Sequence, residues 1–374
     1  MTAFNSQYNN SYDNCRVFLT GATGFKGSWL TTCLRMLGAK IRGYSLDIPS
    51  QPNHFSLLKN DIDDCRGDVR NFEQLSQSVR EFEPQIVFHL AAQPLVRASY
   101  DDPLGTLSTN IIGTANILQA CRAVSSIRAV VIITSDKCYE NKEWSQAYRE
   151  HDSLGGHDPY SASKACAEIV TASFRRSFPS DHLLIASCRA GNVIGGGDWA
   201  SDRLFPDLIR ATINPTESNK NNKKNQSTTA TTIRMPNAIR PWQHVLEPLH
   251  GYLLIGQKLL EGNKDFAEAW NFAPKTEGNC SVGEIVKRAA KYWDKINYQI
   301  VPNNNSSNDN KHEAAQLSLD STKAQQRLAW QPVWTLERSI ERTITWYKNF
   351  YEQNKIQTQT QIEEYIQNRT DKNF

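Results

Sequence analysis

Apolar residues in the first half of the chain form short uninterrupted runs, separated by segments of helical periodicity. Five runs are interpreted as strands, and they cover residues 16–20, 40–46, 85–90, 129–134 and 183–188. Helical patterns cover residues 28–38, 106–123 and 160–177. Strands without polar and apolar alternation are typical of parallel sheets buried on both faces. The sequence therefore predicts an α/β fold in which helices cover both faces of a parallel sheet.

The pattern changes near Gly195-Gly196-Gly197, after which strand signals become sparse. This change predicts a first domain and a smaller mixed α/β domain. The first covers residues 14–194, with 241–274 packing back on it, and the second covers 195–240 and 275–352. Polar segments at 214–232 and 303–310 are predicted to be mobile surface loops, and residues 353–374 a weakly attached polar tail.

The composition excludes several classes of function. The 374 residues carry a net charge of +3 without a Lys/Arg block interleaved with aromatic residues, so no nucleic acid is expected. No apolar run reaches the ~18 residues of a membrane-spanning helix, and residues 1–14 lack the features of a signal peptide. The eight cysteines contain no C-x-x-C pair. We therefore expect no metal, no membrane association, and reduced thiols in the cytoplasm.

A glycine motif, G-x-x-G-x-x-G, joins the first strand to the first helix and spans residues 21–27. Its glycines let the backbone approach a pyrophosphate, whose charge is stabilised at the helix N-terminus. By itself the motif is also compatible with a tight strand–helix turn. Asp47 favours the dinucleotide, because a carboxylate at the end of the second strand bonds the adenosine ribose and repels the 2′-phosphate of NADP. Asp68 is a candidate contact for the adenine. These features predict NAD and a Rossmann-type doubly wound sheet.

Two pairs of ionisable residues predict acid/base chemistry. Tyr160 and Lys164 are four residues apart in a predicted helix, so their side chains share one face. The ammonium is expected to lower the pKa of the phenol, so that Tyr160 acts as a general base on a hydroxyl. Asp136-Lys137 follows the strand at 129–134, at the edge where parallel strands meet a ligand. Each pair alone is compatible with ordinary surface or helix charges. Together they indicate oxidation plus a second proton transfer.

With these motifs the chain, from about residue 16 to residue 351, resembles the extended short-chain dehydrogenase/reductase superfamily in its nucleotide-sugar branch. Within that branch it is most similar to the 4,6-dehydratases that act on CDP-glucose. The resemblance rests on TGATGFKGSWL at 20–30, HLAAQPLV at 89–96, TSDKCY at 134–139, RAGNVIGGGDW at 189–199 and NAIRPWQHV at 237–245.

The resemblance implies that the first domain binds NAD, that the smaller domain binds the nucleotide sugar, CDP-glucose, and that the protein is a homodimer or homotetramer. Cofactor contacts are expected from Gly21, Thr23, Gly24, Phe25, Lys26, Gly27, Asp47, Asp68, Val69, Leu90, Ala91, Ala92, Tyr160 and Lys164. Catalysis is expected from Ser135, Asp136, Lys137, Tyr160 and Lys164. Substrate contacts are expected from Gln93, Asn192, Asp202, Arg203, Arg240 and His244. Asp202 and Arg203 are also compatible with a surface ion pair, and His244 with a buried structural histidine.

The reaction implied by the resemblance is a dehydration. Tyr160, with Ser135 as relay, deprotonates the sugar 4-OH while NAD oxidises C4. A base then removes the C5 proton, and Asp136, its pKa raised by burial, protonates the departing 6-OH. Hydride returns from NADH to C6 and leaves a 4-keto-6-deoxy sugar.

Lys137 departs from the related dTDP-glucose dehydratases, which have Glu at this place. A free lysine has a pKa of ~10.4 and is protonated at neutral pH. Lys137 is therefore either a C5 base with a depressed pKa, the favoured interpretation, or a charged stabiliser of the enolate. Three alternatives remain: a dehydratase of a dTDP-, GDP- or UDP-sugar, a 4-epimerase with no use for Asp136 and Lys137, and a non-catalytic dinucleotide-binding regulator.

Overall fold

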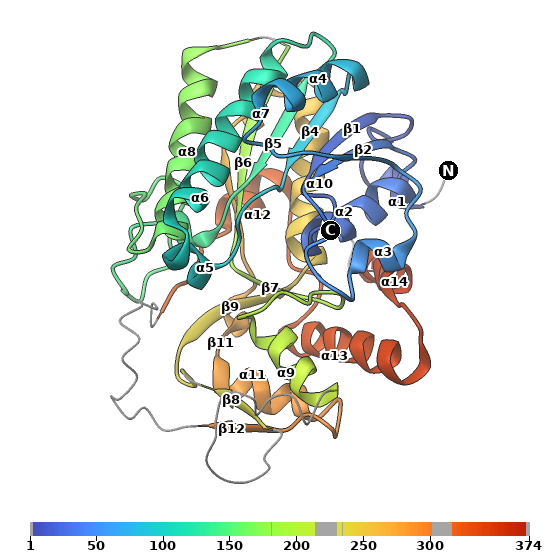
Figure 1. Ribbon diagram of the computed structural model, residues 1–374, viewed down its shortest axis with the longest axis vertical. Coiled ribbons are helices and arrows are strands. Elements are labelled where there is room, and N and C mark those ends of the chain that lie inside the picture. Colours follow the sequence, from blue (N-terminus) through green and yellow to red (C-terminus); the bar gives the residue numbers. More distant parts are fainter. Residues whose placement is uncertain (1–2, 181, 214–229, 234, 301–315, 372–374) are drawn as a thin grey trace.

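The computed structural model describes residues 3–180, 182–213, 230–233, 235–300 and 316–371. The chain folds around a seven-stranded sheet in the order β10-β6-β5-β4-β1-β2-β3, in which all neighbours are parallel (Figure 1). Its strands are β1 (Arg16–Thr20), β2 (Lys40–Ser45), β3 (Asp63–Arg66), β4 (Ile86–His89), β5 (Ala129–Ile133), β6 (Leu184–Ala190) and β10 (Ala269–Phe272). The predicted α/β class with a Rossmann-type doubly wound sheet is confirmed.

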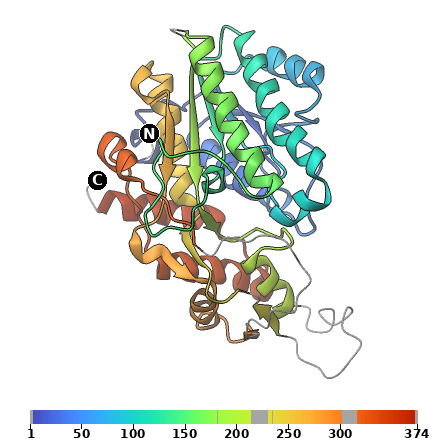
Figure 2. The ribbon, with the colours of Figure 1, turned by 90° about the vertical axis from the view of Figure 1, so that its left-hand side faces the viewer.

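Helices cover both faces of this sheet (Figures 1 and 2). One face carries α4 (Phe72–Phe82), α7 (Gly113–Arg122) and α8 (Pro159–Ser177), and the other carries α2 (Phe25–Met36), α10 (Leu246–Leu260) and α12 (Thr322–Leu328). Successive residues of β5 therefore enter different cores. Val130 and Ile132 pack in the core under α7, whereas Ala129 and Val131 pack in the core under α10. This two-sided burial explains why the strand sequences are apolar without alternation.

A smaller region lies beyond the carboxyl ends of the large sheet (Figure 1). It contains the three-stranded sheet β11-β9-β7 and the two-stranded sheet β12-β8. Its strands are β7 (Asn192–Ile194), β8 (Thr231–Ile233), β9 (Ile239–His244), β11 (Asn279–Ser281) and β12 (Tyr298–Ile300), and its helices include α9 (Leu204–Ile213), α11 (Val282–Ala290) and α13 (Leu336–Gln353). Between β9 and β11 the chain returns to the large sheet through α10 and β10.

Two predicted helices differ in detail from the observed ones. The first begins at Phe25 rather than residue 28, because Gly24 has extended backbone and is the N-cap. The segment predicted as one helix at 106–123 consists of α6 (Pro103–Leu107), a π-helical turn at Ser108–Ile112, and α7. Asn110 in that turn is buried and donates a hydrogen bond to the Gln93 carbonyl, 3.1 Å away, in the loop after β4. The remaining short helices are α1 (Ala3–Ser6), α3 (His54–Leu58) and α5 (Val96–Asp101).

Both ends of the chain pack more closely than the sequence predicts. Near the N-terminus, Tyr12 is buried and its hydroxyl donates to the Leu253 carbonyl at 2.6 Å. The prediction of a weakly attached tail at 353–374 is wrong for residues 358–371, because they form α14 (Thr358–Asp371), which has buried residues. The buried Tyr365 of α14 donates to the Glu247 carboxylate at 2.7 Å. The overall polarity of this segment conceals its apolar face, which includes Ile362.

The segments predicted as mobile loops at 214–232 and 303–310 lie outside the described residues, except for residues 230–232, where the loop prediction is wrong for Thr231 and Thr232 because they belong to β8. Within the described part of the chain, no helix combines the length and apolar character needed to cross a membrane.

Candidate active site

A cavity of about 400 Å³ lies where the large sheet faces the smaller region. The elements that follow β5 and β6 contribute to its wall, as expected at the carboxyl ends of parallel strands. Nine residues predicted to bind or to act on ligands line it: Lys26, Ser135, Asp136, Lys137, Tyr160, Asn192, Asp202, Arg203 and Arg240. The structure therefore brings residues from widely separated segments to one site.

The glycine loop between β1 and α2 can be built only from glycine at two positions. A Cβ on Gly21, whose φ is +75°, would lie 2.8 Å from the Ala91 amide nitrogen, and one on Gly27 would lie 2.0 Å from the Gly21 carbonyl oxygen. Gly24 caps α2 without a side-chain hydrogen bond, so the amides of the first turn have no side-chain cap. A narrow backbone loop before an uncapped helix N-terminus fits the pyrophosphate of a dinucleotide.

The other residues predicted to bind the cofactor lie along the carboxyl ends of β1 to β4. Exposed Asp47 follows β2 and accepts a hydrogen bond from the Ile48 amide at 2.7 Å. Asp68 follows β3, and its hydrogen bonds with Arg70 hold the pKa of its carboxyl below the usual range. Half-buried residues 90–92 follow β4, with the Ala91 amide 3.2 Å from Thr20 Oγ1. Three further residues were predicted to bind the cofactor. The Thr23 hydroxyl donates to the Asp47 carbonyl. Phe25 is half-buried, and the Val69 side chain belongs to the core.

Tyr160 is fixed at the first turn of α8. The N-cap Asp158 accepts hydrogen bonds from the Ser161 amide at 2.9 Å and the Ser161 hydroxyl at 2.6 Å. The Tyr160 side chain is buried but lines the cavity. Burial raises its pKa to about 12, while hydrogen bonding with Ser135 and the charge of Arg203 act in the opposite direction. The prediction that this phenol has a lowered pKa is therefore wrong for the chain itself, because desolvation outweighs the nearby groups that favour the phenolate.

Lys164 lies one helical turn after Tyr160 and is also buried. Its ammonium donates to the Ile133 carbonyl of β5 at 3.4 Å. Burial lowers its pKa to about 8, and the attraction of Glu168 opposes this change. The Tyr–Lys pair therefore sits where α8 meets the end of β5, and burial acts against the charged form of both groups.

Asp136 and Lys137 lie in the 3₁₀ turn η2 (Asp136–Cys138), which follows β5. Asp136 is 3% exposed, and Ser135 Oγ donates to its Oδ1 at 2.8 Å. Its Oδ2 is buried and makes no hydrogen bond to any described residue. Burial raises the pKa of Asp136, which is the direction that a general acid requires. Lys137 is half-buried, and its ammonium makes no hydrogen bond within the described part of the chain.

Cationic and acidic side chains both line the part of the cavity shared with the smaller region: Lys26, Arg203 and Arg240 lie there together with Asp198, Asp202 and Asp207. Arg240 of β9 is 5% exposed and donates to the Ile239 carbonyl at 2.9 Å. Arg203 pairs with Asp198 at 3.1 Å rather than with neighbouring Asp202. Burial, followed by the charges of Arg203 and Lys164, lowers the pKa of Lys26 to about 8. The two guanidinium groups suit a diphosphate, because a planar guanidinium binds phosphate oxygens through two hydrogen bonds.

Two residues predicted to contact substrate do not line the cavity. Gln93 supports its own loop, because its side chain bonds the Leu95 backbone and Thr106 Oγ1. His244 is fully buried, with its ring centroid 5.6 Å from that of Trp29 and 4.7 Å from that of Trp334. Because His244 is fully buried among these indoles and does not line the cavity, the structure favours the alternative of a buried structural histidine.

Several cavity residues were not predicted, among them Tyr139, Arg97 and Tyr100. Tyr139 directly follows Lys137-Cys138, and this position was the available signal. Arg97 and Tyr100 lie on α5, just after the loop that Gln93 supports, but nothing in their spacing indicated a site. Their position depends on the packing of α5 against α8.

A glycine loop on a doubly wound sheet, with a Tyr–Lys pair at the same sheet edge, defines an enzyme of the short-chain dehydrogenase/reductase type. A sequence model described as GDP-mannose 4,6 dehydratase matches residues 18–343, and the chain belongs to this family. CDP-glucose 4,6-dehydratase from Salmonella typhimurium is 47% identical over 348 residues, which cover 91% of this chain and 92% of that enzyme. The predicted resemblance is therefore confirmed.

Solved structures of lower sequence identity share the fold. The dTDP-glucose 4,6-dehydratase DesIV from Streptomyces venezuelae, solved with NAD bound, has a TM-score of 0.71 at 19% identity, covering 89% of this chain and 97% of its own. UDP-glucose 4-epimerase from Thermotoga maritima has a TM-score of 0.73 at 19% identity, covering 90% of this chain and 99% of its own. Because dehydratases and epimerases share this architecture, the fold does not distinguish the two reactions.

Proposed function

We propose that the protein is an NAD-dependent CDP-glucose 4,6-dehydratase, which converts CDP-glucose to CDP-4-dehydro-6-deoxyglucose and water. The observation that carries this proposal is the second ionisable pair. Asp136 and Lys137 line the same cavity as Tyr160, and only an elimination step needs them. The 47% identity to the Salmonella enzyme supports CDP-glucose as the substrate.

NAD would be held by the glycine loop, Asp47 and Lys164, and it would supply the oxidation of C4 and the reduction of C6, ending unchanged. The residues of this chain fit that group, because the loop at Gly21 and Gly27 has no room for a Cβ and α2 has no side-chain cap. The division of the chain into residues 14–194 with 241–274 and residues 195–240 with 275–352 would place the cofactor on the first part and the nucleotide sugar against the second.

Tyr160 takes the proton of the sugar 4-OH when C4 is oxidised. The phenol must first lose its own proton, which burial opposes and which hydrogen bonding with Ser135 and the charge of Arg203 favour. The resulting 4-ketone acidifies the C5 proton. Asp136 gives its proton to the departing 6-OH, which leaves as water, and its raised pKa keeps that proton available.

Lys137 acts as the base at C5. It removes the C5 proton before elimination and returns a proton to C5 after C6 is reduced. A charged Lys137 that only stabilises the enolate is the alternative role, and it would leave the C5 proton to another base. Arg240 and Arg203 bind the diphosphate of the nucleotide sugar.

A substrate panel tests the proposal. The protein is incubated with NAD and with CDP-glucose, dTDP-glucose, UDP-glucose or a GDP-hexose, and products are followed by mass. We expect loss of one water from CDP-glucose. A preference for dTDP-glucose would contradict the CDP assignment, and a product of unchanged mass with inverted C4 would identify a 4-epimerase.

We also propose that a second copy covers helices of the α8 face. Leu104 of α6 is 77% exposed, Ile112 of the π-turn 51%, and Ile169 of α8 55%. Large apolar side chains exposed on neighbouring helices favour self-association. The sequence predicted a homodimer or homotetramer, and light scattering after size exclusion tests this.

The eight free cysteines support the predicted cytoplasmic location.

A further inference from the structure

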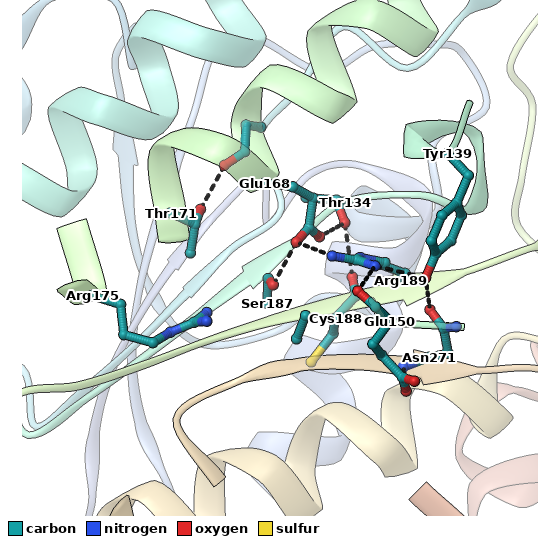
Figure 3. A network of polar contacts seen from close by, with 12 residues as sticks. Thr134, Tyr139, Glu150, Glu168, Thr171, Arg175, Ser187, Cys188, Arg189 and Asn271 are labelled. Atoms are coloured by element: carbon teal, nitrogen blue, oxygen red, sulfur yellow. Dashed lines mark hydrogen bonds and ion pairs between the residues drawn. The ribbon is translucent and has the colours of Figure 1, made fainter. Parts of the chain in front are cut away.

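A buried ion pair lies behind the wall of the cavity (Figure 3). Arg189 Nη2 of β6 is 2.8 Å from Glu168 Oε2 of α8, and the two side chains are 3% and 2% exposed. Neither residue lines the cavity. Removing two charges from water is costly, and such a pair often contributes less stability than apolar residues of the same volume. Its presence therefore calls for a role besides stability.

The Glu168 carboxylate holds the residue that precedes the catalytic turn. It accepts hydrogen bonds from Thr134 Oγ1 and, at 2.7 Å, from Ser187 Oγ (Figure 3). Thr134 lies directly between β5 and Ser135, while Ser187 belongs to β6. One carboxylate therefore joins α8 to the middle of β6 and to Thr134 after β5, immediately before the segment Ser135–Cys138.

The Arg189 guanidinium holds the residue that follows the same turn. Its Nη1 donates to Tyr139 Oη at 2.6 Å and to the Glu150 carbonyl at 3.1 Å. The Tyr139 hydroxyl in turn donates to Asn271 Oδ1 of β10 at 2.8 Å (Figure 3). The guanidinium carbon also lies 4.9 Å from the centre of the Tyr139 ring, and this ring lines the cavity.

We propose that the Glu168–Arg189 pair is a positioning device for the turn that carries Asp136 and Lys137. Glu168 fixes the residue before the turn and Arg189 fixes the residue after it. A turn of three residues has too few internal hydrogen bonds to hold two functional side chains in place. The inference rests on the proposed function, because the turn matters only if elimination takes place in the cavity.

Glu168 has a second effect through its place on α8. It lies one helical turn after Lys164, and its charge favours the ammonium of that residue. The other ionisable groups near Lys164 are Lys26 of α2, His89 of β4 and Cys138 of η2. Replacing Glu168 with Gln removes the carboxylate that favours the charged form, so the pKa of Lys164 falls further below its usual range.

The mildest test removes one hydroxyl. Tyr139→Phe deletes the bonds to Arg189 and Asn271 but keeps the ring. With NAD and CDP-glucose we expect kcat to fall by about 10-fold with KM changed by less than about 3-fold, because small displacements of catalytic groups slow the chemical step. Because Tyr160 and Lys164 lie on α8, outside the turn, C4 oxidation should slow less than elimination, and reduced cofactor should accumulate during turnover, as measured by its near-ultraviolet absorbance. Glu168→Gln should also move the alkaline limb of the pH profile to lower pH.

Tyr365→Phe is the matched control, because it also deletes a buried phenol hydroxyl bonded to a charged side chain, here the Glu247 carboxylate, and Tyr365 does not line the cavity. It should lower thermal stability and leave kcat unchanged. The inference is overturned if Tyr139→Phe keeps the wild-type kcat, or if its kcat falls without accumulation of reduced cofactor. Wild-type turnover of another nucleotide sugar would overturn the substrate assignment alone, and the variants are then compared on that sugar. If wild type dehydrates none, both proposals fail.

Discussion

The two ionisable pairs of the cavity differ in how the chain holds them. Tyr160 and Lys164 lie on the 19-residue helix α8, whose periodicity fixes their spacing. Asp136 and Lys137 lie in a turn of three residues, where adjacent side chains have no fixed relation to a common face. The first pair is therefore positioned by local structure. The second depends on Glu168 and Arg189, which come from other elements of the fold.

The pairs also differ in burial. Tyr160, Lys164 and Asp136 are all nearly inaccessible to solvent, and in each case burial acts against the charged form. Lys137 is half-buried and faces the cavity. The comparison teaches that a helix can bury both members of a pair, whereas the turn buries the acid and leaves its cationic neighbour accessible to a ligand.

The largest effect is expected from breaking the helical pair. Tyr160→Phe removes the group that takes the 4-OH proton, and turnover of CDP-glucose should fall by ~10³-fold or more, since general acid–base catalysis contributes on this order. Product formation measured by mass spectrometry checks this. Tyr365→Phe is the control for loss of a buried hydroxyl, and a Tyr160→Phe protein within about 10-fold of wild type would contradict the assignment.

Breaking the turn pair should slow elimination by ~10²-fold. Lys137→Met keeps the length of the side chain but cannot carry a proton. In deuterated water the wild-type protein should incorporate deuterium at C5 of the product, and the variant should exchange this proton much more slowly. Normal exchange in Lys137→Met would show that Lys137 is not the C5 base and would favour enolate stabilisation.

The pH profile sharpens the comparison of burial. The pKa of Lys164 is lowered to about 8, so its ammonium is present below this pH and is lost above it. Asp136, with its raised pKa, likewise acts as an acid only while protonated. The contribution of the Lys164 ammonium to activity should therefore fall as pH rises through about 8, by about 10-fold one pH unit higher. A profile that stays flat to about pH 9.5 would contradict a role for the Lys164 ammonium.

The smallest effect is expected from the cap that fixes the helical pair. Asp158→Ala removes the N-cap of α8 and should lower the free energy of unfolding by about 1 kcal/mol, measured by urea denaturation. Because Tyr160 lies in the first turn, kcat should also decrease. Thr335→Ala, which removes the N-cap of α13, should lower stability similarly without changing kcat. Equal activity of the two variants would show that the cap does not position Tyr160.

Local sequence patterns were sufficient to predict those elements whose structure has a local physical cause. Continuous apolar runs identified five of the seven strands of the large sheet, whereas β3 and β10 were not predicted. The sequence of β3 is polar because its edge position leaves Asp63 and Asp64 exposed. The sequence of β10, by contrast, contains the polar Asn271, and a 3₁₀ turn (Lys264–Phe266) separates it from the helix α10.

The candidate site shows the same division. Ser135, Asp136, Lys137 and Tyr160 were found because a strand end and a helical repeat mark them. Gln93 was assigned to substrate from its position after a strand end and His244 from its place near Arg240, but neighbouring side chains in the fold determine where these two groups point. The polar segment 353–374 was misjudged because two apolar positions are enough to pack a helix when the facing surface supplies Glu247.

By itself the sequence determined the parallel sheet, the glycine loop and the spacing of Tyr160 and Lys164, because each follows from backbone geometry within a few residues. Only the tertiary structure decided the ionisation behaviour of the site, since desolvation depends on all surrounding elements and it reversed the expected shift in the pKa of Tyr160. It alone also brought Glu168 and Arg189 to the two ends of the catalytic turn, because their contact joins a helix to a strand 21 residues away.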